Sequence, residues 1–330
     1  MSEPLHVLIV GCGEIAGRTD LGRLDTAPPM THAGAFGAHG RFAVTGCTDI
    51  DPGRAEAFSS AWSIPHHFNN IAAALVGAPA TGWDVISVCT PDETHGDLLG
   101  EILESPPRLA FCEKPLDTDL ERAQKLVAAY RDARIGLAVN HLRRWDPKVS
   151  ALRKALAAGD YGPVHSIVGT YTKGLWHNGS HMLDLITNLF GNPIPEQVMG
   201  VNVDHAPNDP TIDVRLRLDD GTPVTLLGGD QRRYPMFELT IICADGTISM
   251  ERGGFAWRLR AAGDSPEFPG HRHLGEGEIT PGSIDAAMAC AADNIAGYLD
   301  VGEPLACDGP TALGTLECCA AIAELARATG

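Results

Sequence analysis

Basic residues are scarce in this chain of 330 residues. It contains 25 Lys and Arg against 42 Asp and Glu, which gives a formal charge of −17 at pH 7. Nucleic acids and anionic membrane surfaces are bound through clustered Lys and Arg. The composition therefore speaks against both as partners.

Long apolar runs are missing as well. No stretch approaches the roughly 20 consecutive apolar residues that cross a bilayer. The first residues, Met1 to Pro4, lack the basic segment that opens a signal peptide, and a strand-like run follows at once. We therefore expect a soluble, cytoplasmic protein.

The nine cysteines include no C-x-x-C pair. Several lie inside apolar runs, such as Ile86–Cys89, and Cys318-Cys319 lies in an Ala-rich helical stretch. Buried, reduced thiols in a reducing compartment account for this pattern. We assign the cysteines no functional role.

The first half of the chain alternates short apolar runs with helical patterns, which is typical of a parallel α/β sheet. Continuous apolar runs are expected for strands that are buried on both faces. Helices are expected at about 52–62, 92–104 and 118–132, with Asp117 and Thr118 as caps of the last one. The predicted strands are Val7–Val10, Phe42–Cys47, Trp83–Cys89, Leu109–Cys112 and Ile135–Val139.

The second half has a different pattern. Helices are expected at 147–158, near 180–190 and at about 310–328. Between them, strand-like runs follow one another with short turns such as Asp219–Gly221 and Ala244–Gly246, which indicates a largely antiparallel sheet. The predicted strands are Val164–Tyr171 and runs near 197–205, 211–218, 223–229, 236–243 and 246–251.

These patterns predict an α/β protein of two domains, in agreement with a prior of about 150 residues per domain. Residues 1–145 are expected to form a doubly wound parallel sheet. Residues 146–330 are expected to form an α+β domain with an open, largely antiparallel sheet.

A glycine-rich turn follows the first predicted strand. Gly11, Gly13 and Ala16 reproduce the G-x-G-x-x-G/A pattern of a Rossmann dinucleotide-binding domain, with Glu14 and Ile15 inside it. The first glycine turns the chain, the second lets a pyrophosphate approach the backbone, and the small third residue lets a helix pack closely. The N-terminus of that helix is expected to offer amide donors to the phosphates.

An acid follows the second predicted strand. Asp49 is placed to bind the adenosine ribose, although the spacing exceeds the usual 20 or so residues because Arg18–Met30 looks like an insertion. A carboxylate there repels a 2′-phosphate, so we expect NAD in preference to NADP. Two alternatives stay open: Asp49 or Asp51 caps the helix that begins near Pro52, and Arg54 admits NADP.

Glu113 and Lys114 follow the strand at 109–112. In an open α/β sheet, ligands bind outside the carboxyl ends of the strands. A Lys at that edge can serve as an acid or base if burial and cofactor charge lower its pKa towards neutrality. The alternative is an exposed ion pair ahead of a helix.

A second polar cluster lies around the helix near 180–190. His181 and Asp184 share a face of this helix, and His181 lies in its first turn, where the helix N-terminus favours the neutral imidazole. His177 lies four residues earlier, so a metal pair with Asp184 as third ligand fits the spacing. We expect Asn178-Gly179 to break the helix between the two histidines, and we expect no metal.

Together, these motifs resemble the Gfo/Idh/MocA family of nicotinamide-dependent oxidoreductases. The resemblance covers nearly the whole chain, with the motifs in the family's order. It rests on Gly11–Ala16, Cys89-Thr-Pro-Asp-Glu-Thr-His95, Cys112-Glu-Lys-Pro-Leu116, Val139–Pro147 and Gly179–Asp184.

The resemblance implies that a sugar, cyclitol or sugar-derived substrate lies between a Rossmann domain and an open-faced sheet domain. It implies that Lys114 contacts the nicotinamide ribose and the reacting hydroxyl, and that His181 is the main acid/base residue. Homodimers or homotetramers through the open sheet face are usual for the family. The residues that would line the cofactor cleft are Thr90, Pro91, His95, Glu113, Asn140 and Arg144.

One position departs from the family pattern. Many dehydrogenases of the family carry Asp four residues before the catalytic His, and His177 stands there, although Asp184 remains on the helix. We expect NAD-dependent hydride transfer at a secondary alcohol, with Lys114, His177, His181 and Asp184 at the catalytic site. Two alternatives stay open: an elimination or epimerisation with tightly held NAD in a closed redox cycle, and a non-catalytic NAD sensor.

Overall fold

The computed structural model describes residues 3–23 and 26–329. They form two compact units. The N-terminal unit lies within Met1–Asp146 and Asp285–Leu313, and the C-terminal unit within Pro147–Ile284 and Gly314–Gly330. The sequence predicts residues 285–313 in the second expected domain, 146–330. In the structure these residues belong to the N-terminal unit.

The N-terminal unit is built on a parallel sheet. In the described residues its strands are β1 (Leu5–Val10), β2 (Phe42–Thr48), β3 (His66–Phe68), β4 (Val85–Val88), β5 (Leu109–Cys112) and β6 (Gly136–Val139). Their order is β3-β2-β1-β4-β5-β6. The order reverses between β1 and β4, which is the point at which a doubly wound sheet binds its ligand.

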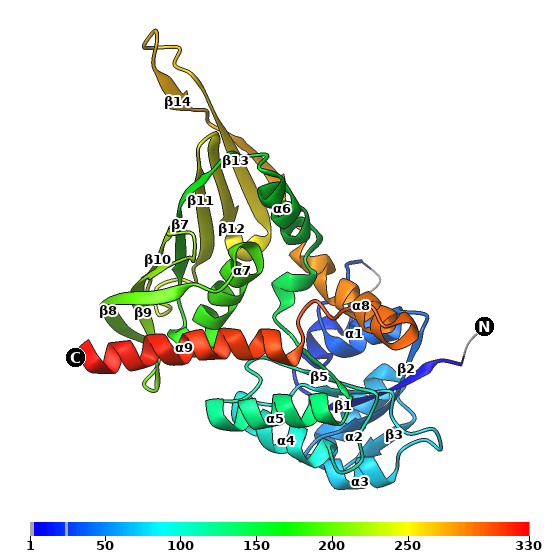
Figure 1. Ribbon diagram of the computed structural model, residues 1–330. Helices are drawn as coiled ribbons and strands as arrows, with labels where there is room; N and C mark the ends of the chain where they lie inside the picture. The colour runs from blue at the N-terminus through cyan, green and yellow to red at the C-terminus, as the bar shows by residue number, and fades with distance from the viewer. Residues whose placement is uncertain (1–2, 24–25, 330) are drawn as a thin grey trace. The chain divides into compact units, whose positions relative to one another are not determined.

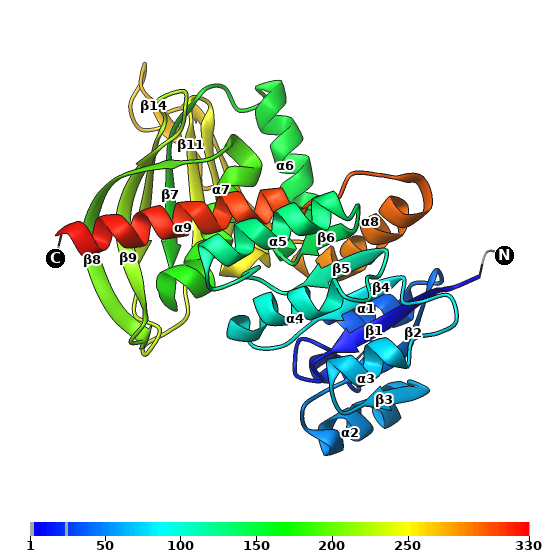
Figure 2. The ribbon, with the colours of Figure 1, turned by 60° about the horizontal axis from the view of Figure 1, so that its bottom comes forward.

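Helices cover both faces of this sheet. They are α1 (His32–Ala38), α2 (Pro52–Trp62), α3 (Ile71–Val76), α4 (His95–Ile102), α5 (Leu120–Asp132) and α8 (Ala287–Val301). Helices α1 and α8 lie side by side on one face, and α4 and α5 lie on the other (Figures 1 and 2). The α8 side is closely packed, because a Cβ added at Gly136 of β6 would lie 2.7 Å from the ring of Tyr298.

The C-terminal unit contains a mixed, largely antiparallel sheet. Its strands are β7 (Val164–Tyr171), β8 (Ile194–Ala206), β9 (Asp209–Arg217), β10 (Pro223–Gly228), β11 (Phe237–Cys243), β12 (Gly246–Glu251), β13 (Ala256–Asp264), β14 (Arg272–Leu274) and β15 (Glu278–Pro281). The order is β14-β13-β12-β11-β7-β10-β9-β8, and β15 pairs with β13. Only β7 and β10 pair in parallel among the described strands of this sheet.

One face of this sheet carries the core of the unit. It packs against α6 (Pro147–Ala158), α7 (Ser180–Phe190) and the C-terminal part of α9 (Gly309–Thr329). The strands alternate between buried and accessible residues, as expected for a sheet with one covered face. On the accessible face, Met199, Val201, Leu227 and Ile242 are exposed.

The predicted fold class is confirmed in both units, and α6, α7, β7 and β12 have the predicted bounds. Two local predictions are wrong. Asp119, and not Asp117 or Thr118, accepts the backbone N–H of Arg122 and caps α5. Residues 178–179 do not break the helix, because a π-helical segment, η4 (Gly174–Gly179), continues directly into α7.

None of the helices in the described ranges is long and apolar enough for a membrane span.

Candidate active site

The glycine-rich loop leaves β1 at the switch point of the N-terminal sheet. Gly11 has a φ of +87°, and a Cβ there would lie 2.9 Å from the carbonyl oxygen of Cys89, so this position requires glycine. A Cβ at Gly13 would meet no atom within 4 Å. Ala16 is fully buried, whereas Glu14 and Ile15 are exposed. The loop therefore has a tightly packed base and an open outer side at Gly13, where a pyrophosphate can approach the backbone.

The chain after this loop does not enter a long helix at once. The N–H groups of Gly17 and Arg18 donate to the carbonyl of Gly13, a short 3-10 helix, η1 (Arg18–Asp20), follows, and α1 begins only at His32. The insertion predicted at Arg18–Met30 thus precedes α1, and the N-terminus of α1 does not follow the glycine loop directly, contrary to what is expected of a helix that offers amide donors to the phosphates. The fully buried carboxylate of Asp20 accepts the N–H groups of Met30 and Thr31, which closes the inserted segment.

Asp49 connects β2 to the glycine loop. It is buried, its Oδ2 accepts the N–H of Cys12 at 2.9 Å, and its Oδ1 accepts the N–H of Asp51 at 2.9 Å. Asp51 is the residue that caps α2, because it accepts the N–H groups of Gly53 and Arg54. The guanidinium of Arg54 lies 3.6 Å from Asp49 Oδ2.

A cavity of about 430 Å³ opens beside Asp51 and Arg54. Its size is in the range of ligand pockets. Because it lies at the carboxyl end of β2, it is the part of the N-terminal unit suited to the adenosine half of a dinucleotide. Its lining consists of Cys12, Arg18, Leu21, Asp51, Gly53, Arg54, Ala57, Phe58 and Ala61.

The other half of the sheet edge carries the remaining predicted residues of the N-terminal unit. Thr90 and Pro91 follow β4, Glu113 and Lys114 follow β5, and Asn140 follows β6. These three strands are neighbours, so the five residues meet at one edge of the sheet. Lys114 and Asn140 are buried, at 6% and 3% exposure. The predicted Arg144 is half-buried on the short helix η3 (Leu142–Trp145) that follows.

His95 ties two of these strand ends together. Its side chain is fully buried at the start of α4. Nδ1 lies 2.7 Å from the carbonyl oxygen of Pro115, and Nε2 lies 2.9 Å from that of Thr90. His95 is therefore buried beneath this edge of the sheet, and its two hydrogen bonds hold the loops that carry Thr90 and Lys114.

One residue of this edge had no signal in the sequence. His32 is fully buried, and its Nε2 lies 2.8 Å from Oε1 of Glu113. The same oxygen accepts a hydrogen bond from Nδ2 of Asn140 at 2.6 Å. His32 Nδ1 lies 2.7 Å from the hydroxyl oxygen of Ser87 in β4.

The charges of His32 and Glu113 depend on each other. Burial disfavours the charged imidazole, but the contacts with Cys89 and Glu113 outweigh burial and raise the pKa of His32 to about 10. Burial also disfavours ionised Glu113, but His32, Asn140 and Lys114 lower the pKa of this carboxyl below its usual value. At neutral pH the two residues form a buried ion pair.

In the C-terminal unit, His177, His181 and Asp184 lie on one continuous helical path through η4 and α7. The rings of His177 and His205 are 6.2 Å apart, and the ring of His181 lies 6.5 Å from that of Phe237. Both histidines are half-buried. Asp184 is buried and accepts a hydrogen bond from the hydroxyl of Thr315 at 3.2 Å.

Two carboxylates that the sequence analysis missed hold the segment before His181. Asp209 accepts the N–H groups of Trp176 and His177 at 2.8 and 3.0 Å, and Asp204 accepts that of Lys173 at 2.9 Å. Lys173 has a φ of +73°, a conformation that costs energy for a residue with a side chain. The hairpin of β8 and β9 therefore fixes the turn that leads into α7.

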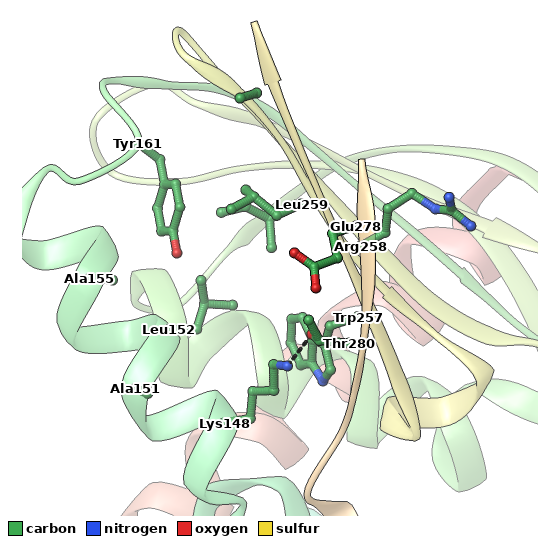
Figure 3. A pocket seen from close by; sticks show the side chains of 12 residues that line it. Lys148, Ala151, Leu152, Ala155, Tyr161, Trp257, Arg258, Leu259, Glu278 and Thr280 are labelled. Carbon is green, nitrogen blue, oxygen red and sulfur yellow. Dashed lines mark hydrogen bonds between the residues drawn. The ribbon is translucent and has the colours of Figure 1, made fainter. Parts of the chain in front are cut away.

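The described residues include no group of three His, Cys, Asp or Glu side chains that could hold a metal ion. A further cavity of about 430 Å³ lies between α6 and strands β13 and β15 of the C-terminal unit (Figure 3). Its wall is mostly apolar, and Lys148 at its edge donates to the hydroxyl of Thr280. None of the predicted site residues lines this cavity.

Residues 5–141 match the model of the Gfo/Idh/MocA family, described as an oxidoreductase family with an NAD-binding Rossmann fold. These residues thus carry the NAD-binding domain of this family. The predicted resemblance is thus confirmed for the part of the chain that carries the glycine loop, the strand-end residues and the His32–Glu113 pair.

Two relatives of this chain are inositol dehydrogenases. It is 32% identical to inositol 2-dehydrogenase of Rhizobium meliloti over 139 residues, which are 42% of this chain and 40% of that protein. It is 27% identical to myo-inositol dehydrogenase Hyg17 of Streptomyces leeuwenhoekii over 290 residues, which are 81% and 82% of the two chains. The match to the Rhizobium protein thus spans less than half of that protein's length.

A solved structure has the same fold as this chain over nearly its whole length. The WlbA dehydrogenase of Bordetella pertussis, in complex with NADH and UDP-GlcNAcA, superimposes with a TM-score of 0.76 at 19% identity. The match covers 98% of this chain and 97% of that one. At this identity the likeness establishes the fold.

Proposed function

We propose that the protein is an NAD-dependent oxidoreductase that transfers a hydride between nicotinamide and a secondary alcohol or ketone of a sugar, cyclitol or related compound. The observation that carries the proposal is the open outer side of Gly13 at the switch point, together with buried Lys114 at the same edge of the parallel sheet. The named activities of the two inositol dehydrogenase relatives support the substrate class.

The residues present fit NAD. The proposed contacts are Gly11, Gly13, Glu14, Ile15 and Ala16 at the pyrophosphate and Asp49 at the adenosine ribose. The nicotinamide half would lie against Thr90, Pro91, Glu113, Lys114, Asn140 and Arg144, and His95 would act through the loops that carry Thr90 and Lys114. NAD is favoured over NADP because buried Asp49 repels a 2′-phosphate, although Arg54 beside it offers a partial counter-charge.

The chain's own part in the reaction is to hold the substrate and move its hydroxyl proton. Bound NAD supplies the hydride acceptor. We assign the proton transfer to Lys114 and His181. His177, which lies four residues before His181 in the helical segment that Asp209 fixes, is proposed as a further catalytic residue. Asp184 is proposed to position α7, because it is buried and bonded to Thr315.

We also propose that the protein is a cytoplasmic homodimer or homotetramer. An apolar, accessible sheet face supports association, because isolated monomers rarely expose large contiguous apolar patches. The exposed apolar residues on β8, β10 and β11 are Met199, Val201, Val203, Leu227 and Ile242. The nine cysteines, all free, fit a reducing compartment.

The proposal is tested with Lys114→Ala. Formation of NADH is followed with NAD and a panel of inositols and sugars, and cofactor binding is titrated separately. We expect turnover to fall by at least about 100-fold, while the Kd for NADH changes by less than about fivefold. Lys125→Ala is the matched control, because Lys125 is exposed on α5 and pairs only with Glu121 among the contacts of the described residues.

Two results would contradict this function. Wild-type turnover in Lys114→Ala would remove Lys114 from the catalytic site, and failure of the wild-type protein to bind NAD, NADH or NADP would refute the cofactor assignment. Near-stoichiometric NAD or NADH released by denaturing freshly purified protein would instead favour the closed redox cycle. Cofactor binding without any turnover would favour the sensor.

A further inference from the structure

His32 is a buried base that the proposed reaction does not use. It lies in the first turn of α1, beyond the inserted segment, and its side chain is fully buried. Its two ring nitrogens face Ser87 Oγ at 2.7 Å and Glu113 Oε1 at 2.8 Å. An imidazolium donates from both nitrogens, and here each nitrogen has an acceptor in place.

Glu113 uses one oxygen for the interior of the unit. Oε1 accepts hydrogen bonds from Nε2 of His32 and from Nδ2 of Asn140. Oε2 contacts no hydrogen-bond donor of the described residues, and the Glu113 side chain keeps 14% of its surface accessible. The carboxylate therefore faces inward with one oxygen and presents the other at the strand edge.

The orientation of Asn140 follows from the charge of Glu113. An ionised carboxylate only accepts hydrogen bonds, so the Asn140 atom 2.6 Å from Oε1 is the amide nitrogen. This turns Asn140 Oδ1 the other way, where it is buried without a hydrogen-bond partner among residues 3–23 and 26–329. A buried acceptor without a donor costs free energy, which a ligand with an N–H or O–H group would recover.

We propose that His32 is a positioning residue that keeps Glu113 ionised, so that Glu113 Oε2 and Asn140 Oδ1 are held as acceptors for the nicotinamide half of the cofactor. The inference rests on the proposed function. The nicotinamide half carries matching donors, a carboxamide NH2 group and two ribose hydroxyls. His32 itself contacts neither cofactor nor substrate in this arrangement.

Other titratable groups near the pair do not replace His32. Cys89 and Glu113 raise the pKa of His32. His32 and Lys114 lower the pKa of Glu113. The pKa of Cys112 is raised well above its usual value by burial and by Glu113, so this thiol stays neutral. Lys114 is the remaining cation, and the proposed reaction assigns it to the substrate.

The test measures the Kd for NADH by fluorescence between pH 5.5 and 8.5. In the wild-type protein the ion pair persists across this range, so we expect a change of less than about threefold. In His32→Gln, burial without the cation raises the pKa of Glu113. When the pH lies below the pKa of Glu113, each pH unit between them lowers the ionised fraction of Glu113 about tenfold. We therefore expect NADH to bind about tenfold more weakly at pH 5.5 than at pH 8.5.

Two further variants separate positioning from general damage. His66→Gln removes an exposed histidine of β3 and should keep the flat wild-type profile. Glu113→Gln removes the titrating group, so the double variant His32→Gln/Glu113→Gln should bind NADH weakly but without dependence on pH. A merely structural loss in His32→Gln would weaken binding equally at both pH values and would overturn the proposal.

A measurement on the wild-type protein covers the case in which His32→Gln does not fold. Nitrogen-15 NMR of the histidine side chains should show one imidazole that keeps both nitrogens protonated from pH 5.5 to 8.5. The signal of this charged imidazole should be missing from the spectrum of folded Glu113→Gln, which assigns it to His32. A neutral His32 in this range would refute the inference and leave the proposed function intact. Failure of the wild-type protein to bind NADH at any pH would refute the proposed function instead.

Discussion

Asp49→Asn should shift cofactor preference towards NADP and loosen the glycine loop at the same time. The carboxylate accepts two backbone N–H groups, those of Cys12 and Asp51. An asparagine side chain has one oxygen, so one of these N–H groups loses its acceptor. A hydrogen bond to a charged group contributes about 1.5–3 kcal/mol, and we expect the free energy of unfolding to fall by about 2 kcal/mol.

The change in selectivity follows from charge. A carboxylate and one phosphate charge about 5 Å apart repel each other by about 3 kcal/mol at an effective dielectric constant of about 20. Arg54, which lies 3.6 Å from Asp49 Oδ2, would lose that partner and face the phosphate. The ratio of the Kd values for NADP and NAD should therefore fall by about 100-fold in Asp49→Asn.

The assay is a titration of NAD and NADP against the wild-type protein, Asp49→Asn and Glu56→Gln, with urea unfolding in parallel. Glu56→Gln is the matched control, because Glu56 is exposed on α2 and does not line the cavity at the carboxyl end of β2. This variant also removes one carboxylate charge, and it should change stability and selectivity little. Equal selectivity in Asp49→Asn and the wild-type protein would refute the assignment of Asp49 to the adenosine ribose.

Two other changes probe the glycine loop and the turn before α7. Gly11→Ala forces an L-residue to a φ of +87° against the Cys89 carbonyl, so it should cost about 2 kcal/mol of unfolding free energy. Gly13→Ala meets no atom within 4 Å, so it should unfold like the wild-type protein and still bind NADH about tenfold more weakly. Equal binding by Gly13→Ala and the wild-type protein would contradict the pyrophosphate assignment. Asp209→Ala frees the N–H groups of Trp176 and His177, so kcat should fall about tenfold with the Kd for NADH unchanged; an unchanged kcat would show that this turn does not position the catalytic helix.

Much of the fold was predictable because its signals are local. Continuous apolar runs mark β1, β4, β5 and β6, and hairpin turns such as Ala244–Gly246 mark the antiparallel sheet. The glycine loop could be predicted for the same reason, since its residues are neighbours in the chain. The strand-end positions of Glu113 and Asn140 followed once the strands were placed.

The remaining features depend on contacts between distant residues. His32 is separated from Glu113 by 81 positions in the sequence. The insertion before α1 also places His32 well beyond the glycine motif, so the motif does not point to it. Asp204 and Asp209 lie about 30 positions from the backbone groups that they accept. No local pattern links such partners. The helix through residues 178–179 shows the converse, because Asn and Gly favour a break that the carboxylate of Asp209, bonded to Trp176 and His177, counteracts from another strand.

The return of residues 285–313 to the N-terminal unit makes the two units inseparable by a single cut. The backbone passes from one unit to the other at 146–147, at 284–285 and again at 313–314. A fragment ending at Asp146 would keep the nucleotide loop but lose α8, whose Tyr298 packs over Gly136 and whose Met288 touches Asn140. A free-standing nucleotide-binding module that keeps α8 therefore needs two separate stretches of the chain, joined from Asp146 to Asp285 through a new linker.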